Sequence, residues 1–320
     1  MKIYVSSYNG VLEEYKSQVE YAPPLDADKM VLWQDTIGSP GKLVEMSRKF
    51  FPKPIYTMQH GRRASRDYDA PLKRKFNSDL FLAWGKWDYD NMTRLGYKAE
   101  IVGCPLNTWI KPKVAHKEKV ILFVPVNTGK EEPDNINVYI ELQKIKLDMI
   151  QQGLMNNYEP LRAQWDVNKI SRGALSNDFT LLAKSLPWHD NKFYTEGVIK
   201  GVQASIKNNQ ILFDLLRNVD LVVGLDEGTT ELFAAAHDVP IIVVDGFEYR
   251  WTEHGGARVK PPVTPGITHC RLEDLKECVE RALAHPEELR QERRALAENE
   301  MSLDSIPNPI ARLHEIIGSR

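Results

Sequence analysis

The chain has 320 residues, of which 42% are hydrophobic and 27% charged, and a formal net charge of -2. A chain of this length buries roughly three quarters of its unfolded surface and exceeds the usual size of one domain, so two domains are expected. No apolar run reaches the roughly 18 residues of a spanning helix, and the opening MKIYVSSYNG lacks the pattern of a signal peptide. These features exclude an integral membrane protein with spanning helices and predict a soluble, cytoplasmic one.

Neither a disulfide framework nor a metal site is indicated. The three cysteines, Cys104, Cys270 and Cys278, are odd in number and form no C-x-x-C pair. No H-x-x-x-H motif or clustered set of carboxylates points to a bound metal. We therefore expect reduced cysteines and no metal.

Charge is unevenly distributed along the chain. Residues 1–112 hold 17 Lys and Arg against 13 Asp and Glu, which is a net charge of +4 and leaves -6 for the rest. Nearly all of the excess lies between Arg48 and Lys75, where nine basic residues face only Asp67 and Asp69. Because such a segment attracts opposite charge, an anionic partner is expected here.

In the first 112 residues, short apolar runs alternate with helical patterns. The predicted strands are 2–5, 30–33, 54–58, 79–84 and 99–102, and the predicted crossover helices are 41–51 and 87–97. This alternation is typical of a parallel sheet covered by helices. The Pro- and Lys-rich segment 103–119 has no sustained period, and we place the domain boundary within it, after residue 112.

The second half repeats the same pattern. Strands are predicted at 120–126, 179–184, 220–225 and 240–245, and helices at 138–152, 203–217, 230–238, 272–301 and 307–318. The sequence therefore predicts an α/β protein with two Rossmann-like, doubly wound domains. Their expected bounds are 1–112 and 113–303, followed by a C-terminal helix at 304–320.

Candidate functional residues are those that follow the strands, because doubly wound sheets bind ligands at the carboxyl ends of their strands. His60 follows the third predicted strand, and Gly61 gives the next turn conformational freedom. A neutral imidazole can act as a base near pH 7, although a loop histidine can also simply hydrogen-bond its neighbours. The next cations, Arg62, Arg63 and Arg66, either bind phosphate groups or face solvent.

The strongest local signal is the segment LVVGLDEGTTELFAAAHDVPIIVVD, residues 221–245. It predicts a strand, a Gly-Thr-Thr turn, a short Ala-rich helix and a second strand. A first helical turn with Gly228, Thr229 and Thr230 offers backbone N–H groups and hydroxyls to a diphosphate. Ordinary N-capping by either threonine is the alternative.

A second set of candidate phosphate contacts follows the strand 179–184. Lys184 and His189 could reach a donor phosphate, while Trp188 between them could cover a base or pack in the core. The chain has neither a G-x-x-x-x-G-K-[ST] loop nor a G-x-G-x-x-G fingerprint. Their absence argues against a P-loop nucleotide hydrolase and an ordinary dinucleotide-dependent dehydrogenase.

These motifs, in this order, resemble the GT-B glycosyltransferases. The likeness is to the branch of teichoic-acid glycerophosphotransferases and capsule polysaccharide transferases, and more distantly to the non-hydrolysing UDP-sugar 2-epimerases. It implies two Rossmann-like domains facing a cleft, with His60 as the acceptor base. It also implies donor-phosphate contacts from Lys184, His189, Gly228, Thr229 and Thr230.

The chain departs from the family pattern at the position that binds the donor ribose. The family has an acidic residue seven positions before the helix-terminating proline, and Phe233 stands there in this sequence. Glu231 is the nearest acid, but two residues span about 200° around a helix, so it does not simply replace the missing one. Glu231 nevertheless remains a candidate donor contact.

The resemblance implies an inverting, metal-independent glycosyltransferase without a cofactor. It would move a sugar from a nucleotide-diphosphate donor, such as a UDP-sugar, to an acceptor hydroxyl. The basic first domain suggests an anionic acceptor, either a wall or capsule polysaccharide or DNA that carries a hydroxylated base. Two alternatives stay open: a UDP-sugar 2-epimerase, and a non-catalytic protein that binds a polyanion or nucleic acid. The oligomeric state is not indicated.

Overall fold

The computed structural model describes two compact units. The described residues are 1–6, 11–33, 38–59, 61, 77–114, 119–124, 137, 138, 140–142, 144, 145, 148, 181–183, 209–225, 227–245 and 263–319. The first unit comprises the described residues up to Ile110 and those from Ala295 onward, and the second comprises those from Lys111 to Arg294.

The first unit is built on a six-stranded parallel sheet in the order β2-β1-β3-β4-β5-β6. Its strands are β1 (Lys2–Ser6), β2 (Glu20–Tyr21), β3 (Lys29–Leu32), β4 (Ile55–Met58), β5 (Leu80–Ala83) and β6 (Ala99–Ile101). Every residue of β4 and β5 is buried, because helices cover both faces of the sheet. This burial explains why these strands read as continuous apolar runs rather than alternating patterns.

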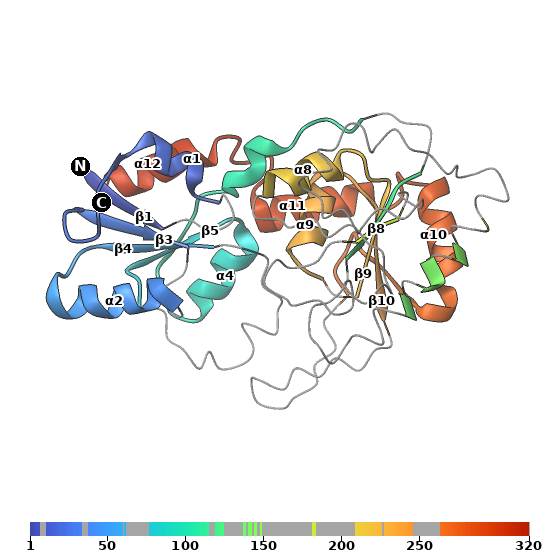
Figure 1. Ribbon diagram of the computed structural model, residues 1–320, viewed down its shortest axis with the longest axis horizontal. Helices are drawn as coiled ribbons and strands as arrows, with labels where there is room; N and C mark the ends of the chain where they lie inside the picture. The colour runs from blue at the N-terminus through green and yellow to red at the C-terminus, as the bar shows by residue number, and fades with distance from the viewer. Residues whose placement is uncertain are drawn as a thin grey trace, which may run out of the picture. The chain divides into compact units, whose positions relative to one another are not determined.

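Helices lie on both faces of this sheet. They are α1 (Glu13–Gln18), α2 (Gly38–Phe50), α4 (Lys86–Arg94) and α12 (Pro309–Ser319), and a 3-10 helix, η1, spans Pro105–Trp109. Figure 1 shows α1 and α12 on one face and α2 and α4 on the other. Helix α12 is tied down at its end, where Lys29 Nζ donates to the Ile317 carbonyl at 2.5 Å.

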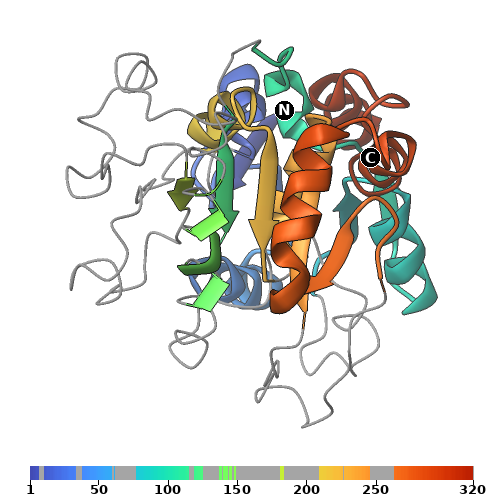
Figure 2. The same cartoon turned by 90° about the vertical axis from the view of Figure 1, so that its right-hand side faces the viewer.

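The second unit contains a five-stranded parallel sheet in the order β11-β10-β9-β7-β8. Its strands are β7 (Ile121–Val124), β8 (Leu181–Ala183), β9 (Leu221–Gly224), β10 (Ile241–Asp245) and β11 (Thr268–Arg271). Its helices are α8 (Asn209–Leu216), α9 (Thr229–Ala236), the 3-10 helix η2 (Leu272–Asp274), α10 (Leu275–Ala284) and the start of α11 (Arg290–Met301). Figure 2 shows α10 lying across one face of this sheet.

The two faces of the second sheet have separate cores. Leu275, Val279 and Leu283 of α10 recur every four residues and pack against alternate residues of β7, β9 and β10. Val138, Leu142 and Ile145 join the same cluster. On the opposite face, Phe213 of α8 packs against Phe233 of α9, with ring centroids 4.8 Å apart and the ring planes tilted by 52°.

The winding of both sheets reverses at an identifiable point. Among the described strands, β1 is followed by β2 on one side and β3 on the other, and β7 is followed by β8 on one side and β9 on the other. A crevice outside the carboxyl ends of the strands at such a reversal is the usual ligand site of doubly wound sheets. The reversal therefore marks the ends of β7 and β9 as the place to look in the second unit.

All nine strands predicted from the sequence are confirmed, with ends shifted by one or two residues. Strands β2 and β11 and helix α1 were not predicted, because each is short and has no sustained apolar period. The structure also groups the chain differently at its C-terminal end. Helix α11 begins in the second unit and ends in the first, which also includes α12. No helix among the described residues is long and apolar enough to cross a membrane.

The C-terminal part of α11 packs directly on the turn between β5 and α4, and Gly85 makes this packing possible. A Cβ placed at Gly85 would lie 2.4 Å from the Asn299 carbonyl oxygen, whereas one at Gly318 would have no atom within 4 Å. We expect Gly85→Ala to lower the free energy of unfolding by about 3 kcal/mol, because backbone must move to admit the methyl group. Gly318→Ala is the control and should change it by less than about 1 kcal/mol. Urea unfolding measures both, and equal stabilities would contradict this packing.

Candidate functional site

Helix α9 begins at the carboxyl edge of the second sheet, beside the point where the winding reverses. Its N-cap residue, Gly228, has an extended backbone, and the Leu232 amide donates to the Gly228 carbonyl at 3.2 Å to start the helix. Seven of its eight residues are buried, which the small alanine side chains allow because the helix packs closely on the sheet. The sequence thus correctly placed the start of a helix at Thr229 and Thr230.

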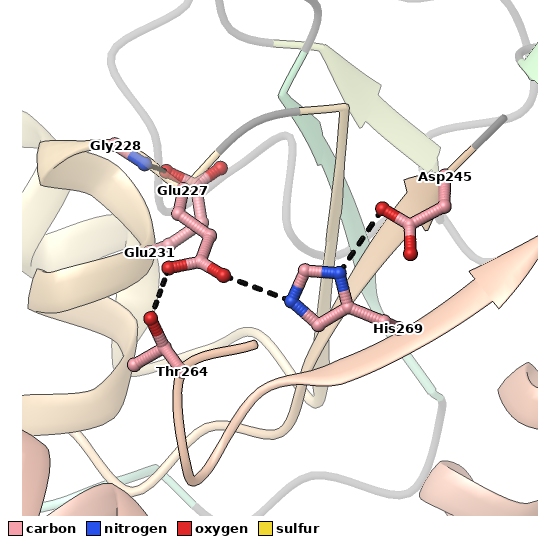
Figure 3. Close-up of polar contacts among 6 residues, drawn as sticks. All are labelled: Glu227, Gly228, Glu231, Asp245, Thr264 and His269. Carbon is pink, nitrogen blue, oxygen red and sulfur yellow. Dashed lines mark hydrogen bonds and ion pairs between the residues drawn. The ribbon is translucent and has the colours of Figure 1, made fainter. Parts of the chain in front are cut away.

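The first turn of α9 carries its own carboxylate. Glu231 Oε2 accepts a hydrogen bond from the Gly228 amide at 3.0 Å, which is one half of a capping box (Figure 3). The Glu231 side chain is buried, and its negative charge is favourable at the positive end of the helix. The Gly228 amide is therefore satisfied internally, and a diphosphate at this turn would have to bind the other amides or displace Glu231.

Position 233, which carries the ribose-binding acid in the family that the sequence resembles, belongs here to the hydrophobic core. Phe233 is 1% exposed and lies against Phe213 of α8. His237, which ends α9, makes an edge contact with the Phe213 ring. Its Nδ1 is hydrogen-bonded to the Phe233 carbonyl oxygen at 2.8 Å. Position 233 therefore cannot contact a ligand without unpacking α8 from α9.

A charged cluster, which we call the Glu-His-Asp cluster, lies next to α9. It comprises Glu227, His269 and Asp245, and Figure 3 shows all three directed toward one another. His269 Nε2 lies 2.8 Å from Glu227 Oε1, and His269 Nδ1 lies 3.1 Å from Asp245 Oδ1. Glu227 precedes the N-cap of α9, Asp245 ends β10, and His269 is the second residue of β11, so the cluster joins the loop after β9 to two neighbouring strands.

Burial and hydrogen bonding act in opposite directions on the pKa of His269. Desolvation by burial lowers this pKa, but the hydrogen bonds and negative charges of Glu227 and Asp245 together outweigh it, and the net pKa is raised. The side chains of His269 and Glu227 are 9% and 7% exposed, while that of Asp245 is 28% exposed. The two carboxylates thus favour the protonated imidazole, and of these three side chains only that of Asp245 has appreciable contact with solvent.

The Thr264 hydroxyl completes the hydrogen bonding of Glu227 by donating to its second carboxylate oxygen. Thr264 lies in a tight turn, since the Ile267 amide donates to the Thr264 carbonyl at 3.2 Å. This turn requires glycine at position 266, where φ is +91° and a Cβ would lie 2.7 Å from the Arg293 nitrogen. Glu227 is therefore held on both oxygens by residues that are fixed independently of α9.

In the first unit, a buried network fixes the turn at the end of β4. Gln59 is fully buried, and its Nε2 donates to Asp88 at 2.7 Å and to the Gly61 carbonyl at 3.1 Å. Its Oε1 accepts from the Trp84 amide at 2.7 Å, which links the ends of β4 and β5. One side chain therefore anchors the chain on both sides of position 60.

Several residues predicted to be functional lie outside the described part of the chain. They are His60, Arg62, Arg63, Arg66, Lys184 and His189. Within the described part, the structure brings Gly228, Thr229, Thr230 and Glu231 together in one turn, while Gly61 lies in the other unit. Among the described residues, no group of three His, Cys, Asp or Glu is arranged to hold a metal ion.

The sequence reasoning missed Glu227, Asp245, Thr264 and His269. A signal was present for two of them, because Glu227 and Asp245 follow or end predicted neighbouring strands, whose carboxyl ends meet at one edge. His269 and Thr264 could not be found in this way, since they belong to a strand, β11, and a preceding turn that were not predicted.

We expect Phe233→Glu to destabilise the protein rather than restore a ribose contact. The substitution removes a buried ring and places a carboxylate against Phe213, so the free energy of unfolding should fall by at least about 4 kcal/mol. Phe233→Leu, which keeps the site apolar, should cost about 1 kcal/mol. Chemical unfolding of the two variants gives the comparison, and a stable Phe233→Glu protein would show that α8 and α9 are not packed as described.

The Glu-His-Asp cluster also predicts how stability depends on pH. Because the folded-state pKa of His269 is raised, its contribution is complete below the unfolded value of about 6.5 and is lost as pH rises through the folded value. The buried His237 acts oppositely: desolvation lowers its pKa, so its effect is a loss of stability as pH falls below about 6.5.

His269→Gln should therefore flatten the decline in unfolding free energy above about pH 6.5 and leave the acidic decline unchanged. The exposed His285, which pairs with Glu287 at the surface, supplies the matched control His285→Gln. Urea midpoints measured from about pH 5 to about pH 9 separate the two limbs. An alkaline limb with the same slope in both variants would rule out a proton held at His269.

Comparison with known proteins supports the fold. No sequence profile of a known family matches the chain, and no curated protein matches it by sequence. The solved structures that it resembles include UDP-GlcNAc 2-epimerase from Neisseria meningitidis bound to UDP-GlcNAc, at 11% identity and a TM-score of 0.53, over 98% of this chain and 79% of that one. The wall teichoic acid polymerase TagF matches at 11% identity and a TM-score of 0.55, over 99% and 88% of the two chains.

A third similar structure is UDP-GlcNAc 2-epimerase from Methanocaldococcus jannaschii in complex with UDP-GlcNAc and UDP. It is 15% identical, with a TM-score of 0.51, over 98% of this chain and 83% of that one. Structural matches at identities this low establish the fold alone. These matches agree with the parallel sheets described above and confirm the resemblance inferred from the sequence: the chain has the GT-B fold of two Rossmann-like α/β domains.

Proposed function

We propose that the protein is a glycosyltransferase that moves a sugar from a nucleotide-diphosphate donor to an acceptor hydroxyl. The observation that carries this proposal is the position of α9. Its N-terminal turn lies at the carboxyl end of β9, next to the reversal of winding, within a GT-B fold. Similar structures with the same fold bind UDP-GlcNAc or are named as a wall-polymer polymerase.

The donor diphosphate is proposed to bind at the first turn of α9, against the backbone and hydroxyls of Thr229 and Thr230. The helix dipole favours an anion at this end. Two carboxylates oppose it, because Glu231 caps the Gly228 amide and Glu227 precedes the helix. The site therefore needs cations, which we assign to Lys184 and His189 as in the sequence-based hypothesis.

The chemical step needs a base and a stabilised leaving group. In the proposed reaction His60 accepts the proton of the acceptor hydroxyl, whose oxygen forms a bond to the anomeric carbon while the bond from that carbon to the diphosphate breaks. The electron pair of the broken bond leaves with the nucleotide diphosphate, whose charge the α9 turn and nearby cations stabilise. Gln59 would support this step by fixing the Gly61 side of the turn.

The basic run from Arg48 to Lys75 supports an anionic acceptor, either a polysaccharide or DNA. A second candidate function is a UDP-sugar 2-epimerase, which needs no acceptor. It is favoured by the two similar structures that are UDP-GlcNAc 2-epimerases in complex with UDP-GlcNAc.

A donor screen and a reaction without acceptor test these proposals together. We expect one of UDP, CDP or GDP to raise the melting temperature, since a ligand that binds only the folded state stabilises it by about 2.7 kcal/mol at a hundredfold excess over its Kd. With UDP-GlcNAc alone, the proposed transferase should yield no 2-epimer by NMR. Formation of the 2-epimer would contradict the proposed transferase activity and support the epimerase.

His60→Ala provides the internal control of this test. It should keep nucleotide binding, which we assign to the second unit, and lose transfer to an added acceptor by at least about a hundredfold, the usual contribution of a general base. Replacement of the exposed His285 by Ala should change neither property. If His60→Ala transfers sugar at the wild-type rate, His60 is not the base.

A further inference from the structure

The geometry points to His269 as a positioning residue for the proposed donor site: its proton holds the turn between β9 and α9 and offsets the negative charge there. This inference rests on the proposed function, because it assigns a role to a residue beside the proposed diphosphate turn. His269 need not touch the donor, since it would act through Glu227, which directly precedes the N-cap residue Gly228.

The hydrogen-bond geometry requires the proton. Both ring nitrogens of His269 lie within 3.1 Å of a carboxylate oxygen, Nε2 facing Glu227 and Nδ1 facing Asp245. A neutral imidazole has one N–H and can donate to only one of them, whereas an imidazolium donates to both. Loss of the proton therefore leaves one carboxylate facing the lone pair of a ring nitrogen.

The groups around His269 come from three directions. Glu227 reaches it from the loop between β9 and α9, and Asp245 reaches it from β10. Thr264, from the turn before β11, holds the other oxygen of Glu227, and Glu231 is bonded to the Gly228 amide. His269 is a cation that these two carboxylates share when its ring is protonated.

Loss of the His269 proton changes both the net charge beside the turn and the hydrogen bonds of the two carboxylates. Two carboxylates and an imidazolium carry a net charge of -1, and deprotonation makes it -2 beside the start of α9. The added negative charge repels a diphosphate, and either Glu227 or Asp245 loses the hydrogen bond that it accepts from the ring. Since a single extra charge near a partly buried site commonly couples by a factor of about ten, we expect diphosphate affinity to fall about tenfold.

The coupling between diphosphate binding and protonation of His269 must be reciprocal. If the protonated form binds the diphosphate about ten times more tightly, then bound diphosphate raises the pKa of His269 by about one pH unit. A residue with a purely structural role would not produce this shift. The prediction therefore has two independent readouts, one on the ligand and one on the imidazole.

The first experiment measures UDP binding by calorimetry from about pH 7 to about pH 9. In this range the terminal phosphate of UDP, with a pKa of about 6, is already largely ionised. Wild-type affinity should fall about tenfold as pH rises, and His269→Gln should abolish that fall. His285→Gln, at an exposed position of the same unit, should behave as wild type. Equal pH profiles for wild type and His269→Gln overturn the proposal.

Glu227→Gln provides a second test of the proposal if His269→Gln fails to fold. This substitution removes one of the two carboxylates that favour the imidazolium, so the fall in UDP affinity should move to lower pH. Thr264→Val, which leaves the charges unchanged, should weaken UDP binding but keep the wild-type midpoint. An unchanged midpoint in Glu227→Gln would contradict the proposal.

A second measurement separates this proposal from the proposed function. In NMR spectra of the wild-type protein without ligand, the Gly228 amide should titrate with the same midpoint as the His269 ring. If UDP binds, the midpoint should rise by about one pH unit, and no rise overturns the inference. If no nucleotide binds at any pH, the donor site is wrong, and a Gly228 amide that still follows His269 supports only its control of the turn. An amide that does not follow the ring refutes that control as well.

Discussion

Both units of the protein depend on parallel sheets whose two faces are covered. Helices bury every residue of β4, β5 and β9, so no polar chemistry can lie on the faces of these strands. The edge formed by the carboxyl ends of the strands is the part of each sheet left for function. The described polar networks follow this constraint: Gln59 follows β4, Glu227 follows β9, and Asp245 ends β10.

At the carboxyl edge of the second sheet, opposing electrostatic effects act on the start of α9. The helix dipole of α9 favours an anion, yet Glu231 already accepts the hydrogen bond of the Gly228 amide, and Glu227 adds a second negative charge. A protonated His269 offsets this charge, and its ring links the loop after β9 and the end of β10 to β11. The arrangement is consistent with a phosphate turn whose charge is adjusted by one proton, rather than with a turn of purely backbone donors.

Phe233 differs from the acidic residue of the family that the sequence resembles, and this difference has a structural consequence. The Phe233 ring joins α9 to α8 by packing against Phe213, and the Phe213 ring also makes an edge contact with His237. An acid at position 233 would require a solvent-exposed helix face at that point, which is absent because seven of the eight residues of α9 are buried. If the proposed donor carries a ribose, its recognition must therefore come from a different element.

The sequence by itself determined nine of the eleven described strands, most helices and the parallel α/β class, because a strand buried on both faces has a continuous run of apolar residues. It also located the turn at Gly228, Thr229 and Thr230 from local composition. Only the tertiary structure decided that Glu227, Asp245 and His269 meet, and that Glu231 caps α9 instead of standing open to a ligand. The reason is physical: β11 has the sequence THCR, which lacks the apolar run of the predicted strands, and the order β11-β10-β9 arises from long-range pairing that local sequence does not encode.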